Sequence, residues 1–456
     1  MKPITRYAKE NPWLGWLLLP ITVIAVFMIG LFAASIMERR TEAIISYAPA
    51  GDIADWEPRA EKWGRHYPRE YETYLKMDET GFRSKFNGNG LVDMLKEDPR
   101  LVVLWAGYGF SQDYNQPRGH TYAVKDIRNT LRTGGPTGPK SGPMPNTCWT
   151  CKSPDVPRIM KEIGPAAFYQ GKWASRGHEI VNPIGCADCH DPETMNLRIS
   201  RPALVEAFER RGKDITKSTH QEMRALVCAQ CHVEYYFKGP GKHLTFPWDQ
   251  GTSVEAMEKY YDDMDFKDWT HKLSRTPMLK AQHPGWELFQ TGIHAQRGLA
   301  CADCHVPYKS SGGMKFSDHQ IVSPLKNIST TCQVCHRESE DELRANVYER
   351  QEKNLQGRMT AEDLLVRAHV EAKKAWDLGA TESDMAPVLK LIRHAQWRWD
   401  FAVASHGAAF HAPLEVSRIL STSIDKAHEA RLLLSRILAK RGHNGPVPMP
   451  DISTKA

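Results

Sequence analysis

The strongest hydrophobic pattern in the chain is an apolar run close to its N-terminus. From Trp13 to Met37, twenty-five residues carry no charge, which is long enough for a helix that spans a bilayer. Three basic residues come before this run: Lys2, Arg6 and Lys9. Basic residues on that side of a span predict a cytoplasmic tail over residues 1–12, an anchor over residues 13–37 and a body on the outer face of the membrane.

A cleaved signal peptide is the alternative interpretation of the same run. Cleavage would then fall near Ala33-Ala34-Ser35. The apolar core of a signal peptide is usually about 7 to 15 residues long, so the longer run favours an uncleaved anchor. In either case the body of the chain faces the periplasm or its equivalent.

The long central part of the chain lacks a sustained helical period. After a charged stretch over residues 38–61, a segment rich in Gly, Pro and aromatic residues continues to about Pro145. Further on, helical patterns are short, as in Pro202 to Arg211 and Val254 to Tyr261. We expect residues 38–355 to form one region of irregular segments and short helices, without a solenoid repeat.

Long amphipathic patterns follow from Thr360 onward. The first is expected from Ala361 to Leu378, with acidic residues in its first turn that complement the helix dipole. Two more run from Ser383 to Ala404 and from Leu414 to Lys440, separated by Gly and Pro. We therefore predict a mainly α fold, with a helical region over residues 356–445 and a tail over residues 446–456.

Composition narrows the class of protein only a little. The 456 residues carry a net charge of +6, with both signs spread along the sequence. No long basic run is present, so nucleic-acid binding is not indicated.

The ten cysteines give the chemical signal, because all of them fall in C-x-x-C pairs. Four pairs are followed directly by histidine, which is the attachment signature of c-type haem. With 19 histidines in 456 residues, four such matches by chance have a probability on the order of 10⁻⁵. The thiols attach the haem vinyl groups and the adjacent imidazole reaches the iron. The four sites are Cys186/Cys189/His190, Cys228/Cys231/His232, Cys301/Cys304/His305 and Cys332/Cys335/His336.

Other uses of paired cysteines fit less well. Zinc ribbons do not need a histidine in the next position, and five half-sites cannot pair evenly. Disulfide scaffolds are typical of much smaller chains, and a thioredoxin-type pair occurs once, in a βαβ context.

The fifth pair, Cys148/Cys151, is followed by Lys152 instead of histidine. An iron closed by two histidines can only pass electrons, whereas one with an empty position can bind a substrate. Lysine can ligate only as the neutral amine. The site that differs is therefore the candidate catalytic haem, and the alternative is a surface lysine beside a haem ligated from elsewhere.

Together these motifs resemble the ammonia-forming pentahaem cytochrome c nitrite reductase family. The Cys-Trp-Thr-Cys-Lys site precedes four C-x-x-C-H sites, with residues 233–237 (Val-Glu-Tyr-Tyr-Phe) directly after the third and residues 280–284 (Lys-Ala-Gln-His-Pro) before the fourth. The likeness extends from about Arg39 to the C-terminal helices. It implies five covalent haems c, with Lys152 as the proximal ligand of the first.

The resemblance also implies an active site on the open face of the first haem. The matching residues are Arg132, Tyr235 and His283. An arginine can attract and polarise nitrite, and the tyrosine and histidine can donate protons as N–O bonds break.

A calcium site beside this haem is implied as well. Its ligands would be the Glu234 carboxylate, the backbone carbonyls of Tyr235 and Lys280, and the side-chain carbonyl of Gln282. Oxygen ligands of this kind suit a hard cation.

The distal ligands of the other four haems are assigned by the same resemblance. His319 is expected at the second haem, His120 at the third and His294 at the fifth. His411 is expected at the fourth, with His406 as its rival. Histidines such as His66, His369 and His443 are expected to be solvated surface residues.

The function expected from the resemblance is six-electron reduction of nitrite to ammonium, in anaerobic nitrite respiration or detoxification. A membrane quinol-oxidising multihaem cytochrome would supply electrons, and the long C-terminal helices would form a homodimer. Two rival interpretations stay open: a non-catalytic electron conduit with five closed haems, or a reductase acting mainly on hydroxylamine or sulfite.

Overall fold

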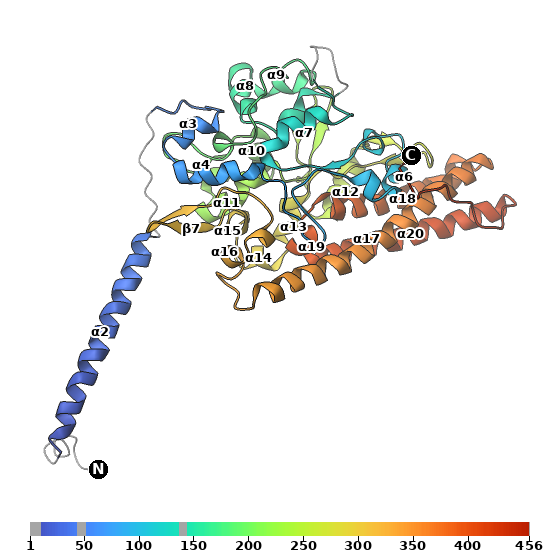
Figure 1. Cartoon of the computed structure of the whole chain (residues 1–456). Coiled ribbons are helices and arrows are strands. Elements are labelled where there is room, and N and C mark those ends of the chain that lie inside the picture. Colours follow the sequence, from blue (N-terminus) through green and yellow to red (C-terminus); the bar gives the residue numbers. More distant parts are fainter. Residues whose placement is uncertain (1–10, 43–51, 136–143, 456) are drawn as a thin grey trace. The chain divides into compact units, whose positions relative to one another are not determined.

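The computed structural model describes residues 11–42, 52–135 and 144–455 and is mainly α (Figure 1). The chain divides into two compact units. One holds Met1–Ala48 and Tyr308–Ser317, and the other holds Pro49–Pro307 and Asp318–Ala456. The expected mainly α fold is confirmed.

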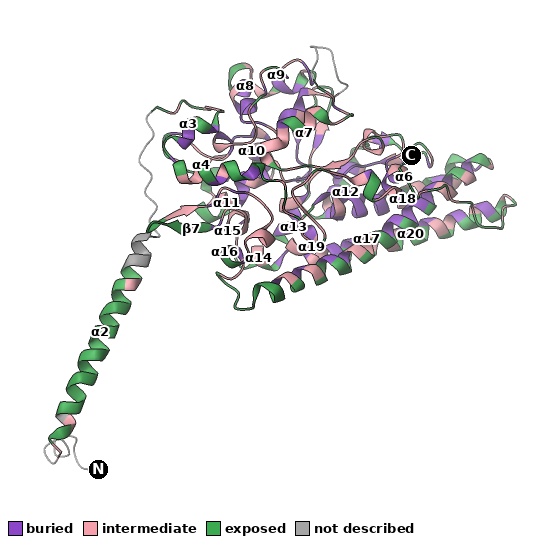
Figure 2. Cartoon of the chain, viewed as in Figure 1, coloured by how far each residue is buried: buried purple, intermediate pink, exposed green. Residues whose placement is uncertain are grey.

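The smaller unit contains the predicted apolar helix. Helix α2 extends from Trp13 to Glu42, and its 22-residue part Trp16–Met37 has a mean hydropathy of 2.6 and no buried residues. Figure 2 shows most of its described residues as exposed. The expected basic tail lies outside the described residues except for its last two positions. The unit also holds an antiparallel hairpin, β7 (Tyr308–Ser311) with β8 (Met314–Ser317).

The larger unit begins with short elements, as the irregular sequence predicts. In the described part of this unit, the α-helices before residue 340 are at most ten residues long, and several 3-10 turns lie between them. They are α3 (Ala60–Gly64), α4 (Pro68–Leu75), α5 (Met94–Glu97), α6 (Arg100–Leu104), α7 (Ala123–Asn129), α8 (Asp155–Ile163), α9 (Pro165–Gln170), α10 (Pro202–Arg210), α11 (His220–Ala229), α12 (Val254–Asp263), α13 (Gly285–Gln290), α14 (Ile293–Gln296), α15 (Cys301–His305) and α16 (Ile328–Thr331).

Three long helices follow: α17 (Glu340–Asp377), α18 (Glu382–Ala404) and α20 (Pro413–Lys440). They lie side by side, and α19 (Ala408–His411) connects the last two (Figure 1). Buried residues line their facing sides in Figure 2. The long C-terminal helices are therefore present as expected.

The predicted start of the first long helix is wrong. Helix α17 begins at Glu340, where the Ser339 side chain and the Glu342 side chain cap each other's backbone N–H groups. Such a reciprocal capping box is a strong start signal. Thr360 lies inside the helix instead, with its hydroxyl donating to the carbonyl of Gln356 at 3.0 Å.

Two small antiparallel sheets fix the segments that matter for chemistry. Strand β3 (Tyr236–Lys238) pairs with β4 (His243–Thr245) directly after Tyr235. Strand β5 (Trp269–Thr270) pairs with β6 (Pro277–Met278) shortly before Lys280. A third pair joins β1 (Val92–Asp93) to β2 (Asn115–Gln116). Because their ladders are short, these hairpins act as local anchors rather than as a sheet layer.

Candidate haem-binding and active site

The attachment motifs form single helical turns that gather their reactive groups. In the second, third and fifth motifs the histidine N–H donates to the carbonyl of the first cysteine at 2.9 Å. This i to i+4 contact places the two thiols and the imidazole on one side of the turn. A C-x-x-C-H sequence therefore presents both vinyl-reactive sulfurs and an iron ligand to the same haem face.

All ten cysteines are free thiols, so the structure contradicts a disulfide scaffold. Within the described residues no group of three or more His, Cys, Asp or Glu side chains is arranged to hold a metal ion. Free paired thiols are the state that haem attachment requires.

Cys335, a predicted haem-attachment residue, is more exposed to solvent than we expect of an attachment thiol. Cys335 is exposed, whereas the other nine cysteines are half-buried. Its neighbours are open to solvent as well, since Val334 is 67% exposed and the His336 side chain is 47% exposed. The physical reason is the place of the fifth motif, in the turn between α16 and α17, where little of the chain packs over it. The protein alone therefore does not bury Cys335, and its attachment role stays a prediction in which the haem would cover the thiol.

Each attachment histidine faces one of the histidines expected as a distal ligand. The ring centroids are 6.1 Å apart for His190 and His319, 6.1 Å for His120 and His232, 6.2 Å for His305 and His411, and 6.4 Å for His294 and His336. The four pairs thus share one spacing although they come from different segments.

That spacing fits two imidazoles bound to opposite sides of one iron. With a metal–nitrogen bond of about 2 Å and roughly 1.1 Å from nitrogen to ring centre, the centroids would be about 6.2 Å apart. The residues present therefore fit four bis-histidine haems. Burial lowers the pKa of His190 to about 4 and of His411 to about 3, which favours the neutral imidazole that a metal needs.

Geometry favours His411 over His406 as the partner of His305. His406 lies instead beside His283, with ring centroids 6.4 Å apart. Two glycines leave room for His411. A Cβ on Gly292 would stand 1.8 Å from the His411 carbonyl oxygen, and one on Gly407 would stand 2.5 Å from its ring.

Replacing Gly292 with alanine should therefore displace His411. We expect the fourth haem to lose its low-spin state, because its distal imidazole would move off the iron. Electron paramagnetic resonance on the purified protein would show added high-spin signal. Gly81→Ala is the matched control, since a Cβ there meets no atom within 4 Å. An unchanged spectrum for Gly292→Ala would remove His411 from the ligand set.

The segment that carries Lys152 is clamped by a buried arginine. Arg201 is 1% exposed, and its Nε and Nη2 donate to the carbonyls of Thr150 at 2.8 Å and Ser153 at 2.9 Å. Its guanidinium also pairs with Asp188 in the second attachment motif at 2.5 Å. The backbone on both sides of Lys152 is thereby tied to the neighbouring haem motif.

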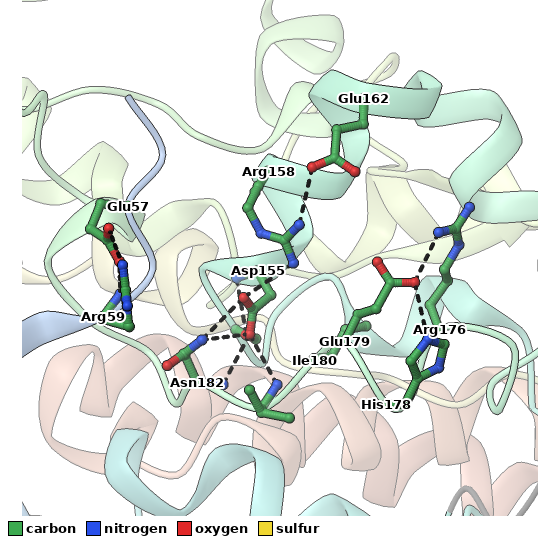
Figure 3. Close-up of polar contacts among 12 residues, drawn as sticks. Glu57, Arg59, Asp155, Arg158, Glu162, Arg176, His178, Glu179, Ile180 and Asn182 are labelled. Atoms are coloured by element: carbon green, nitrogen blue, oxygen red, sulfur yellow. Dashed lines mark hydrogen bonds and ion pairs between the residues drawn. The ribbon is translucent and has the colours of Figure 1, made fainter. Parts of the chain in front are cut away.

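A second clamp lies just beyond Lys152. The buried Asp155 carboxylate accepts from the backbone N–H groups of Val181 at 3.0 Å and Asn182 at 2.9 Å. Figure 3 shows it also bound by the Asn182 side chain and Arg158. Because charged hydrogen bonds are the stronger ones, this loop and the Lys152 turn form one rigid support.

The three expected catalytic residues converge on the first attachment site. The positive charges of Arg132 and Lys152 both act on the Cys148 thiol, against a burial that raises its pKa to about 12. Burial raises the pKa of Tyr235, and the Cys151 and Cys148 thiols add to that rise. Arg132, Tyr235, Lys152 and the two thiols therefore lie close enough to influence one another's charge.

His283 lies near Lys152 as well. Burial, followed by the charges of His406 and Lys152, lowers its pKa to about 3. Its ring meets His232 of the third motif edge-to-face, with centroids 4.6 Å apart. Among the described residues its buried Nδ1 has no hydrogen-bond partner. The histidine is therefore a neutral, polar group facing the region of the first and third motifs.

Neighbouring attachment motifs also touch one another. The Cys151 thiol lies near Cys231, and the Cys228 thiol lies near Cys301, so that each pair shares an electrostatic interaction. These contacts link the first motif to the third and the third to the fourth. Haems attached there would lie in close succession, as electron transfer between them requires.

The expected calcium ligands also come together. The buried Glu234 carboxylate accepts from the Gln282 backbone N–H at 2.6 Å, and the Gln282 side-chain amide donates to the Lys280 carbonyl at 2.9 Å. The oxygen and nitrogen of an amide occupy nearly the same space, so Gln282 turned by half a rotation would point a second oxygen at the same spot.

The charge balance around these ligands favours a cation. Burial raises the pKa of Glu234 well above its usual range, to which the Glu287 and Asp268 carboxylates contribute. Burial likewise raises the pKa of Glu287 to about 8 and of Asp268 to about 7. The positive charge of Lys280 does not fully neutralise these carboxylates, because its ammonium already pairs with Asp400 at 2.7 Å.

One histidine expected at the surface is buried instead. His369 is fully buried and stacks on His271 with centroids 3.6 Å apart. Its nitrogens bond to Ser274 at 2.9 Å and Gln396 at 2.7 Å, so satisfied hydrogen bonds replace solvent. The expectation of a solvated His369 is wrong. His66 fits it better, since its side chain is 32% exposed and pairs with the exposed Asp52.

Known proteins match this chain over nearly its whole length. Residues 59–456 match the family model described as cytochrome c552. The cytochrome c-552 of Parabacteroides distasonis is 62% identical over 448 residues, which cover 98% of this chain and 91% of that protein. The cytochrome c-552 of Porphyromonas gingivalis is 59% identical over 449 residues, with coverages of 98% and 90%.

A solved structure agrees with these sequence matches. The cytochrome c nitrite reductase from Desulfovibrio desulfuricans superposes with a TM-score of 0.80 at 32% identity. The superposition covers 88% of this chain and 90% of that one. Two calcium sites are described in the catalytic subunit of that enzyme.

Proposed function

Since this chain belongs to the cytochrome c552 family and is an oxidoreductase of the cytochrome c nitrite reductase type, we propose that it reduces nitrite to ammonium. The reaction would use one haem held by Cys148, Cys151 and Lys152, and four haems held by histidine pairs. A haem supplies, when bound, electrons and an iron position at which nitrite nitrogen can be held.

The contrast between Lys152 and the four histidine motifs carries this proposal. Every attachment histidine faces one other histidine at a common spacing. The first motif has no such partner histidine, and the groups placed near its thiols or near Lys152 are Arg132, Tyr235 and His283. A conduit with five closed haems needs a fifth ligand pair, whereas this trio is suited to bind and protonate an anion.

Arg132 would bind nitrite through its charge. A guanidinium presents several N–H donors in a fixed plane and stays protonated at any working pH. Arg132 is half-buried, and near a protein surface the attraction between opposite charges is stronger than in bulk solvent. The side chain therefore orients nitrite and polarises its oxygens.

Tyr235 and His283 would supply protons to the oxygens that leave as water. The raised pKa of Tyr235 keeps its phenol protonated and able to donate. The lowered pKa of His283 keeps its imidazole neutral at rest, with one ring N–H that can donate a hydrogen bond to a nitrite oxygen. A proton that it takes up is readily passed on.

We also propose a calcium ion at Glu234, Tyr235, Lys280 and Gln282. It would neutralise buried carboxylates and fix the backbone of Tyr235, so that the phenol keeps its place in the pocket. The gathering of Glu234, Gln282 and the Lys280 carbonyl supports this ligand set, and the nitrite reductase of D. desulfuricans has calcium sites in its catalytic subunit.

Glu234→Gln should lower both calcium content and activity. The amide keeps the shape of the side chain but removes the charge, so we expect activity to fall on the order of 10- to 100-fold, as for a lost outer-shell partner. Metal analysis and nitrite turnover on the same sample would measure it. Glu206→Gln is the control, since Glu206 is one-third exposed and pairs with His243. Full activity without calcium would contradict the proposal.

The membrane and partner relations are part of the proposal. The exposed apolar helix Trp16–Met37 would hold the enzyme at the periplasmic face of the cytoplasmic membrane, or act as a signal that is removed. A membrane quinol-oxidising multihaem cytochrome would donate electrons. The long helices α17, α18 and α20 would form a homodimer.

The direct test of the activity is a nitrite-dependent ammonium assay with a reduced dye as donor. We expect ammonium as the product and no accumulation of nitric oxide or hydroxylamine. Parallel turnover on hydroxylamine and sulfite would rank the three substrates. A purified protein with five haems that yields no ammonium from nitrite would overturn the proposed function.

A further inference from the structure

Arg132 carries a positive charge that the fold does not neutralise. Its Nη1 donates to the backbone carbonyl of Asp113 at 3.0 Å, and its Cζ lies 4.2 Å from the ring centroid of Phe110. Within the described part of the chain, no carboxylate pairs with this guanidinium. Its position is therefore fixed by a neutral carbonyl and an aromatic face, which leave its charge available to a ligand.

The nearby acidic side chain of Asp113 is engaged elsewhere. Its Oδ2 accepts from the backbone N–H of Leu131 at 2.6 Å, and its Oδ1 accepts from the Asn115 amide at 2.5 Å. Asp113 thus grips the residue before Arg132 with its carboxylate and holds Arg132 itself with its carbonyl. One aspartate fixes the arginine without forming an ion pair with it.

The other cation at the same ring shows the contrast. The Lys280 ammonium lies 5.1 Å from the centroid of Phe110, but it pairs with the buried Asp400 at 2.7 Å. Two cations therefore share one aromatic ring, and the fold neutralises only Lys280. Arg132 is half-buried, and a guanidinium held firmly without an internal counter-ion can bind an anion through its free N–H donors.

A stack of three rings limits the movement of Phe110. Tyr108 lies parallel to Phe110 with centroids 5.3 Å apart, and Trp269 lies parallel to Tyr108 at 4.6 Å. Trp269 belongs to strand β5, which is paired with β6. The face on which Arg132 rests is thereby tied to the hairpin before Lys280.

From these contacts we infer that Asp113 is a positioning residue that sets the preference of the active site for anionic substrates. It would keep the guanidinium of Arg132 both placed and free of an internal counter-ion. The inference rests on the proposed function and names what selects its substrate class. Nitrite and sulfite are anions and would depend on Asp113, whereas hydroxylamine is neutral above neutral pH and would not.

Loss of the Asp113 carboxylate should affect binding more than chemistry. Without the hydrogen bond from the Leu131 N–H to the Asp113 carboxylate, the backbone at Arg132 would shift and displace the guanidinium. A misplacement of about 1 Å in a binding group can cost on the order of 100-fold. Since the loss falls on binding of the anion, it should raise KM for nitrite more than it lowers kcat.

The test compares three substrates on Asp113→Asn and Asp113→Ala. We expect KM for nitrite and for sulfite to rise on the order of 10- to 100-fold in Asp113→Ala, and less in Asp113→Asn, which keeps one acceptor oxygen. The value of kcat/KM for hydroxylamine should stay within about 3-fold of wild type. A nitrite titration of the oxidised protein, followed by its absorption spectrum, should show the same loss of affinity.

Asp214→Asn is the matched control. Asp214 also accepts from a backbone N–H, that of Thr216 at 3.0 Å, but it caps an exposed turn, so all three substrates should keep their wild-type constants. Equal losses on nitrite and hydroxylamine, or no loss on nitrite, would overturn the inference. Wild-type protein that makes no ammonium from nitrite would instead overturn the proposed function. If Asp113→Ala attaches fewer haems, Asp113→Asn decides the outcome.

Discussion

Lys152→His is expected to remove most nitrite reduction while five haems remain attached. The backbone around Lys152 is clamped by Arg201 and Asp155, so it cannot adjust easily to a shorter, planar ligand. An imidazole would also change the electron donation to the iron and hence its potential. We expect activity to fall on the order of 100-fold, at least as much as the loss of an outer-shell partner.

The measurement is nitrite-dependent ammonium formation, with haem content determined on the same sample. Lys161→His is the control, because Lys161 is an exposed lysine that pairs with Asp55 at 2.7 Å. It should leave activity and haem content unchanged. Unchanged activity in Lys152→His would remove Lys152 from the mechanism and return it to the surface-lysine interpretation.

Arg132→Gln should have an effect of similar size, concentrated on the binding of nitrite. Glutamine keeps hydrogen-bond donors but loses the charge that the fold leaves unpaired. Removing one preorganised donor at a site of developing charge costs roughly 100- to 1,000-fold. We expect kcat/KM for nitrite to fall in that range, measured by steady-state kinetics with a reduced dye.

Arg176→Gln is the comparison for that experiment. Arg176 pairs with Glu179 at 2.9 Å (Figure 3), and because both side chains are partly exposed to solvent, this ion pair should contribute little. Its loss should leave the kinetics unchanged. A kcat/KM for nitrite in Arg132→Gln within about 3-fold of wild type would show that another group binds the anion.

Features that depend on local sequence could be predicted well. The C-x-x-C-H motif closes within one helical turn, so its chemistry follows from spacing alone. The positions of α18 and α20 could also be predicted from local sequence. Helix α18 begins directly after the N-cap residue Thr381, and α20 begins at Pro413. The prediction of the start of α17 was wrong for a local reason too. The capping box at Ser339 precedes a polar stretch without a clear apolar period, so the sequence pattern did not reveal the helix there.

Features that depend on distant contacts could not be derived from the residues themselves. Lys280 and Asp400 are 120 positions apart, and nothing in either segment predicts their ion pair. The buried stack of His271 and His369 likewise joins two unrelated segments. The exposure of Cys335 also depends on which distant segments reach the fifth motif, which its spacing does not encode. The expected distal histidines and the catalytic trio came from a family resemblance, and the structure adds ring distances that support the histidine pairs.

Asp113 shows how much of the site lies outside the recognisable motifs. Its sequence context, Gln112-Asp113-Tyr114, carries no signature of catalysis. Only the fold reveals that its carboxylate holds Leu131 and its carbonyl holds Arg132. Residues that position a catalytic group through backbone contacts leave little trace in a single sequence.

The central claim is that one haem keeps an open face while the other four are closed by histidine pairs. Low-temperature electron paramagnetic resonance of the oxidised protein, recorded before and after addition of nitrite, tests it most directly. We predict one high-spin haem whose signal changes with nitrite and four low-spin haems that do not respond. Five low-spin haems that ignore nitrite would contradict the account.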